Sequence, residues 1–187
     1  RAHLGLARES NVAYLEHPLS VGYIVKAMGG PIEAVVAGHV HDAWEENPGG
    51  RDDIFNDIYD SLVVDSTELP RYAIYLMSAL TAPSNLESPE RKAYIAQRIK
   101  DEPDPHMQQL LWMLKFADGI HNYSTVGGMG PKHGKTRAER VADKIDELKR
   151  ALDGYADKID EANIGPLGAV MFLGEMMHTY GKPALDA

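Results

Sequence analysis

The sequence contains no cysteine, which excludes a disulfide scaffold and thiolate chemistry. It has no apolar run of about 18 residues and no recognisable signal peptide, so we expect no membrane partner and a cytoplasmic protein. Acidic residues outnumber basic ones, 28 to 19, which gives a formal net charge of −9. A nucleic-acid surface normally needs a basic face, so we expect no nucleic-acid partner. A small phosphorylated ligand is compatible with this charge, because a local basic pocket or a metal ion can overcome the global field.

Hydrophobic residues recur at helical spacing along most of the 187 residues, and no alternating strand pattern persists. We therefore predict an all-α bundle of about eight helices, in a single domain that covers residues 1–187. The helices are expected at approximately 19–28, 31–43, 54–62, 70–80, 88–100, 104–123, 136–159 and 167–180.

Local signals mark where several of these helices begin. Ser88 and Asp104 each precede a proline, which predicts an N-cap followed by a proline in the first turn. Thr136 and Glu139 form a capping-box pattern. The helix that follows carries an apolar stripe with charged flanks, which is either a packing face of its own domain or the seam of a homodimer.

Four side chains share the chemistry of transition-metal ligands. His17, the adjacent pair His41-Asp42, and Asp118 are far apart in sequence, as expected for a site built from several helices. Two imidazoles and two carboxylates suit Mn²⁺, Fe²⁺, Co²⁺ or Zn²⁺. Any one histidine alone is more often structural than a ligand, so the prediction of a metal site depends on the whole set.

Two further carboxylates follow the His-Asp pair on the same helix. Glu45 and Glu46 stand three and four residues after Asp42, so all three share one helix face. Carboxylates one turn from a metal ligand can exchange protons with water or with a leaving group, although such a pair can also be a solvated face. Asn122 stands one turn after Asp118 and is expected to face the same cavity.

Several segments resemble the hydrolase domain of the RelA/SpoT homologue family, in the same order and with similar spacing. The segments are Ala2–Ser10 with Tyr14–Pro18, Ala37–Glu46, Ala79–Thr81 with Glu90–Lys92, and Lys115–Asn122 with Thr125. The resemblance covers about residues 1–126, followed by C-terminal helices over 136–181. No synthetase domain follows, which predicts a stand-alone small alarmone hydrolase of the HD type.

The resemblance implies a function and a role for each motif residue. It implies a (p)ppGpp 3′-pyrophosphohydrolase of the stringent response, in which metal-activated water releases pyrophosphate and leaves GDP or GTP. It also implies a role for each of ten residues: one Mn²⁺ is bound by His17, His41, Asp42 and Asp118; Glu45 and Glu46 are the catalytic acidic pair; Arg8 packs on the purine; and Ser10, Asn122 and Thr125 surround the nucleoside.

The chain departs from the family pattern at three positions. Glu46 stands where the family usually has aspartate, Leu6 where it has glutamine, and Glu9 where it has a basic residue beside the base. The last two changes leave open a phosphohydrolase that acts on (p)ppApp, NADPH or another phosphorylated nucleotide. The change at Glu46 leaves open an inactive domain that binds alarmone or a partner protein.

Overall fold

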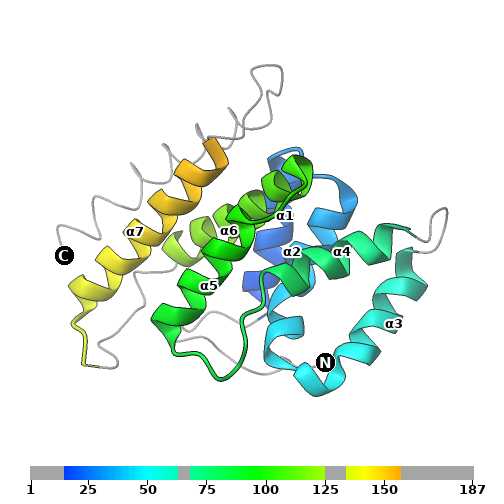
Figure 1. Cartoon of the computed structure of the whole chain (residues 1–187), viewed down its shortest axis with the longest axis horizontal. Helices are drawn as coiled ribbons and strands as arrows, with labels where there is room; N and C mark the ends of the chain where they lie inside the picture. The colour runs from blue at the N-terminus through cyan, green and yellow to red at the C-terminus, as the bar shows by residue number, and fades with distance from the viewer. Residues whose placement is uncertain (1–14, 63–67, 125–133, 157–187) are drawn as a thin grey trace.

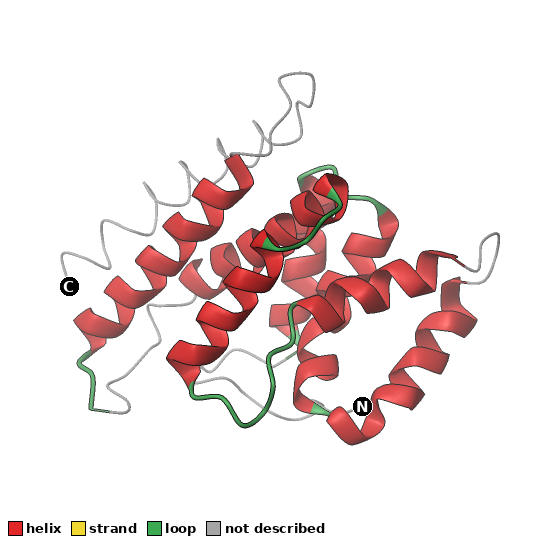
Figure 2. Cartoon of the chain, in the orientation of Figure 1, coloured by secondary structure: helices red, strands yellow, loops and turns green. Residues whose placement is uncertain are grey.

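The computed structural model describes residues 15–62, 68–124 and 134–156. Within these ranges all the regular secondary-structure elements are helices, and there is no β-strand (Figure 2). The helices are α1 (Glu16–Ala27), α2 (Ile32–Glu46), the 3₁₀ turn η1 (Pro48–Gly50), α3 (Arg51–Leu62), α4 (Glu68–Ala79), α5 (Ser88–Lys100), α6 (Pro105–Ser124) and α7 (Arg137–Ala156). The all-α prediction is confirmed. The helix expected at 167–180 lies outside the described residues. None of the described helices is both long and apolar enough to cross a lipid bilayer.

Helix α6 forms the centre of the bundle and packs against α1, α2, α4, α5 and α7 (Figure 1). Its buried side chains include Leu111, Phe116 and Ile120, none of them more than 1% exposed. They join residues of α1, α2 and α4 in one hydrophobic cluster. Because α6 is surrounded in this way, a polar side chain on it is held between neighbouring helices.

Helices α1 and α2 are joined by a tight turn and approach each other closely. Gly29 has a φ of 77°, the left-handed conformation that ends a helix most easily when the residue is glycine. A Cβ placed on Gly38 would lie 3.0 Å from the Cα of Gly22 on the facing helix. The two glycines therefore let the backbones come together, and this contact places the first turn of α1 beside the last turns of α2.

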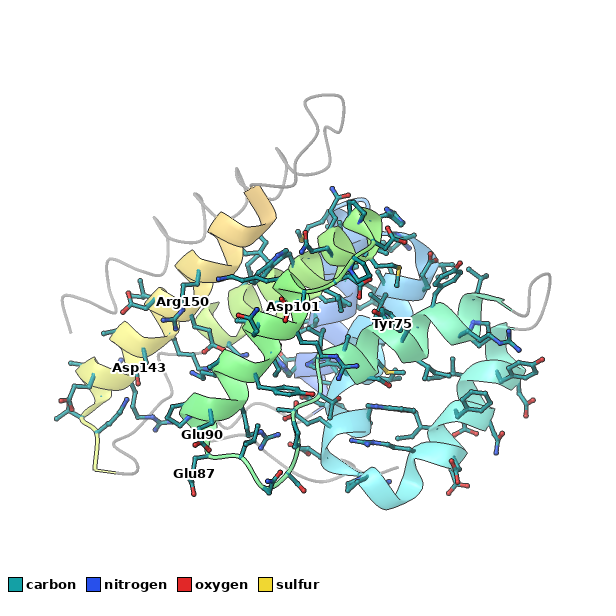
Figure 3. The ribbon with its side chains drawn as sticks, in the orientation of Figure 1. Tyr75, Glu87, Glu90, Asp101, Asp143 and Arg150 are labelled. Carbon is teal, nitrogen blue, oxygen red and sulfur yellow. The ribbon has the colours of Figure 1, made fainter. Side chains whose placement is uncertain are left out.

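The predicted helix starts are mostly confirmed, with two corrections. Thr136 and Glu139 exchange the hydrogen bonds of a capping box, and Asp104 accepts a hydrogen bond from the N–H of His106. The N-cap of α5, however, is Glu87 and not Ser88, because the side chain of Glu90 accepts a hydrogen bond from the N–H of Glu87 in a capping box one residue earlier. Figure 3 shows Glu87 and Glu90 at that end of α5. Pro31, expected in the first turn of α2, is instead its N-cap.

Candidate metal centre

The predicted ligands come together where α1, α2 and α6 meet. His17 is in the first turn of α1 and is 1% exposed. Its Nε2 atom lies 3.6 Å from Asp42 Oδ2 and 3.2 Å from Asp118 Oδ1. One ligand atom from each of His17, His41 and Asp42 lies within 4.8 Å of the other two. Ligands of a single ion with bonds near 2.1 Å are separated by about 3–4 Å, so small side-chain shifts bring this trio to bonding distance.

The ring of His41 is oriented so that one nitrogen remains available. Its Nδ1 donates a hydrogen bond of 2.8 Å to the carbonyl oxygen of Gly38. A backbone acceptor at Nδ1 favours the tautomer whose Nε2 carries a lone pair. That Nε2 is buried and has no hydrogen-bond partner, although Asp42 Oδ1 lies 3.0 Å away. A lone pair facing a carboxylate oxygen requires a proton or a cation between them, so these residues fit a divalent metal ion.

The ring of His17 is held from behind by a second histidine. Its Nδ1 lies 2.8 Å from Nδ1 of His121, on α6, and one of the two nitrogens donates the hydrogen bond. This contact leaves Nε2 of His17 directed at the carboxylates of Asp42 and Asp118. His121 was not among the site residues predicted from the sequence. Its position three residues after Asp118, on the face of α6 that meets α1, was the available signal.

Asp118 lies beside the trio and is fixed by its own helix. Its Oδ2 accepts a hydrogen bond of 2.9 Å from Lys115 Nζ, and its Oδ1 accepts one of 2.5 Å from Asn122 Nδ2. Burial by itself would raise the pKa of Asp118, but Lys115 and the imidazoles of His17 and His41 hold that pKa well below its usual value. Asp118 is therefore an ionised acceptor over the whole physiological pH range.

The carboxylates also determine the charge state of His41 when no cation is bound. Burial would lower the pKa of this imidazole, but the neighbouring carboxylates of Asp42 and Asp118 raise it to about 9. The pKa of Asp42 is lowered in return: burial opposes the shift, and the imidazoles of His41 and His17 outweigh it. His41 therefore favours its protonated form beside the two carboxylates, and a divalent cation that bound its Nε2 would displace that proton.

The two predicted catalytic glutamates lie in different environments. Glu45 is half-buried and pairs with Arg91 of α5, a partner 46 residues away in sequence. Burial raises the pKa of Glu45 even though Arg91 and Lys115 oppose the shift. Glu46 is exposed at the end of α2. The raised pKa of Glu45 is the direction of shift that suits a carboxyl group with a role in proton transfer.

Lys115 connects Asp118 to α7. Its Nζ lies 3.8 Å from Glu147 Oε1, and Glu147 also pairs with Lys92 of α5 and Lys144 of α7. This ion network was not predicted, because its members carry no motif and come from three helices. Three predicted substrate contacts, Arg8, Ser10 and Thr125, lie outside the described residues.

The sequence was also compared with proteins of known function. It is similar to enzymes of (p)ppGpp metabolism. It is 22% identical over 165 residues to the bifunctional (p)ppGpp synthase/hydrolase SpoT of Escherichia coli K12. The aligned region covers 88% of this chain and 22% of that enzyme. A guanosine-3′,5′-bis(diphosphate) 3′-pyrophosphohydrolase of Shigella flexneri matches to the same extent.

A second kind of relative is a GTP pyrophosphokinase of Streptomyces antibioticus, which is 30% identical over 129 residues, 67% of this chain and 14% of that enzyme. The chain therefore spans about a fifth or less of the length of the curated relatives it matches. No family model and no solved structure matches the sequence.

Proposed function

We propose that this chain is the hydrolase domain of a RelA/SpoT-family protein and that it removes pyrophosphate from the 3′ position of (p)ppGpp with one divalent metal ion, Mn²⁺. The observation that carries the proposal is the convergence of His17, His41, Asp42 and Asp118 from three helices, with a buried imidazole nitrogen left without a partner. The similarity to (p)ppGpp hydrolases supports it independently.

In this proposal the four side chains are the metal ligands. His17 and His41 bind through Nε2, because Nδ1 of each is already engaged with His121 or with Gly38. Asp42 and Asp118 contribute the negative charge that a divalent cation needs. A metal ion bound there supplies a Lewis acid that polarises a phosphoryl oxygen and activates water.

The remaining chemistry falls to residues around the metal. Glu45, whose pKa is raised by burial, exchanges a proton with the attacking water or with the departing oxygen of the nucleoside. Glu46 is its partner in the acidic pair. Asn122 keeps Asp118 oriented through its hydrogen bond, and Arg8, Ser10 and Thr125 bind the purine nucleoside.

The test is a measurement of pyrophosphate release by the metal-stripped protein, with and without Mn²⁺. Substrates are ppGpp, ppApp and NADPH, because Leu6 and Glu9 replace residues that the family places near the base. We expect Mn²⁺-dependent release that is fastest with ppGpp. If ppApp or NADPH reacts faster than ppGpp, that nucleotide is the preferred substrate. If all three are recovered intact, the chain is an inactive domain that binds alarmone or a partner protein.

A further inference from the structure

A concave site is lined in part by Glu45, which lies three residues after the proposed metal ligand Asp42. It has a volume of about 460 Å³, within the range of small-molecule sites. It is formed where the end of α2, η1, the start of α3, the end of α4, the loop 81–85 and one face of α5 meet, and these elements can be followed in Figure 1. We call this site the arginine pocket, after Arg51, Arg91 and Arg98 in its lining.

The charge of the arginine pocket is opposite to that of the whole chain. Three arginines and a single carboxylate, that of Glu45, line it, whereas the chain has a net charge of −9. Arg91 is paired with Glu45. Among the described residues, Arg51 and Arg98 form no ion pair. Two guanidinium groups without a neutralising carboxylate, facing one cavity, are typical of sites that bind phosphate groups.

Other groups in the lining suit the same ligand. Arg51 is held in place, because its Nε donates to the carbonyl oxygen of Trp44 at 3.1 Å and its guanidinium carbon lies 5.4 Å from the centre of the Trp44 ring. The indole Nε1 of Trp44 is buried without a hydrogen-bond partner. The loop adds the neutral donors Ser84 and Asn85, whereas the hydroxyl of Thr81 donates to the carbonyl oxygen of Met77 at 2.8 Å. The lining thus offers many donors and one carboxylate, a balance that favours an anion.

Glu45 connects the arginine pocket to the metal centre. It lines the pocket and, at the same time, its pKa responds to the charges of Asp42, His41 and Lys115. A phosphate group in the pocket is therefore next to the carboxylate to which we assign the proton transfer. A diphosphate would also compete with Glu45 for Arg91, whose side chain is 34% exposed and free to reorient.

We propose that the arginine pocket binds the departing pyrophosphate, with Arg51 and Arg98 as its principal contacts and Arg91 shared between pyrophosphate and Glu45. This inference rests on the proposed function, since it names the subsite of the product of that reaction. The pocket binds a diphosphate through charge, and the metal centre is not needed for that binding.

The test is a calorimetric titration of inorganic pyrophosphate into the metal-free protein. Binding is expected, with an affinity that falls as sodium chloride is added. Arg51→Ala and Arg98→Ala should each weaken it by about tenfold or more, since each removes a charge-assisted hydrogen bond. Arg71→Ala, an exposed arginine of α4 outside the pocket, is the matched control and should bind as the wild type does.

Fluorescence locates the ligand. The chain has two tryptophans, and Trp112 is buried in the core on α6, so a Trp112→Phe variant leaves Trp44 as the only reporter. Pyrophosphate should change its emission over the same concentration range as the calorimetric signal. No binding at millimolar pyrophosphate, no change at Trp44, or equal weakening by Arg71→Ala would each overturn the proposal.

The hydrolysis assay fails or succeeds separately from this titration. If the chain binds pyrophosphate in the arginine pocket but releases none from any nucleotide, the pocket assignment stands and the proposed reaction is wrong. If the chain hydrolyses (p)ppGpp but binds pyrophosphate equally well without Arg51 and Arg98, the proposed reaction stands and the pocket assignment is wrong.

Discussion

The proposed metal centre and the arginine pocket both involve Glu45 but are built in different ways. The metal centre uses short side chains that are buried and oriented by fixed hydrogen bonds, such as His41 to the Gly38 carbonyl. The arginine pocket uses long side chains at helix ends and a loop, and Arg98 is exposed. The first can hold ligands to within a fraction of an ångström, as metal coordination requires. The second can adapt to a ligand that is recognised mainly by charge.

The largest expected effect is that of Asp118→Ala on the metal centre. The substitution removes a proposed charged ligand and leaves the buried Lys115 with only the more distant carboxylate of Glu147, at 3.8 Å. We expect Mn²⁺ binding to disappear in calorimetry and turnover to fall by about a thousandfold or more, an estimate based on the metal's role in activating water. The exposed Asp143→Ala is the matched control and should keep both properties. Full activity of Asp118→Ala would show that Asp118 is not a metal ligand.

Glu45→Gln tests the residue that both regions share. We expect Mn²⁺ affinity to stay near that of the wild type, while turnover falls by about 10²–10⁴-fold because a proton-transfer group is lost. Pyrophosphate affinity should rise, since Arg91 is released from its ion pair. Glu46→Gln, at the exposed neighbour, is expected to lower turnover by a smaller factor. Loss of metal by Glu45→Gln would make Glu45 a ligand and not a proton carrier.

Gly38→Ala should separate the two regions. The new methyl group would lie 3.0 Å from the Cα of Gly22, so α1 and α2 must move apart by a few tenths of an ångström. We expect a loss of about 1–3 kcal/mol in unfolding free energy from overpacking, partly offset by the better helix propensity of alanine. Mn²⁺ affinity should fall because His17 and His41 are on the separated helices, whereas pyrophosphate affinity should not change. Equal losses of both affinities would contradict this independence.

The smallest effect is a pH dependence of stability at Glu147, which supports the metal centre through Lys115. Burial would raise the pKa of Glu147, but Lys115 and Lys144 lower it below its usual value. A carboxyl group whose pKa is lower in the folded state stabilises the fold above its unfolded pKa, about 4.5, and this contribution is lost as pH falls through the folded pKa. Urea unfolding at pH 7 and at pH 3.5 measures how much unfolding free energy is lost on acidification. This loss should be about 1 kcal/mol smaller in Glu147→Gln than in the wild type.

Much of the fold could be predicted because the signals are local. Helical periodicity and the capping residues placed seven helices within a few residues of their observed bounds, among them α5 over Ser88–Lys100. The N-cap of α5 was misplaced by one residue, because Ser88 and Glu87 can both accept from the same turn and only the side chain of Glu90 selects between them. Such a choice depends on rotamers, which the order of residues does not specify.

The sequence by itself determined that the chain is helical and that His17, His41-Asp42 and Asp118 are the candidate ligands, because residue type and spacing are properties of the chain alone. Only the tertiary structure decided that His121 holds His17, that Glu45 is half-buried against Arg91 while Glu46 is exposed, and that three arginines line one cavity. The physical reason is that burial and pairing depend on residues from other helices. Which helices meet is fixed by packing, such as the contact of Gly22 with Gly38.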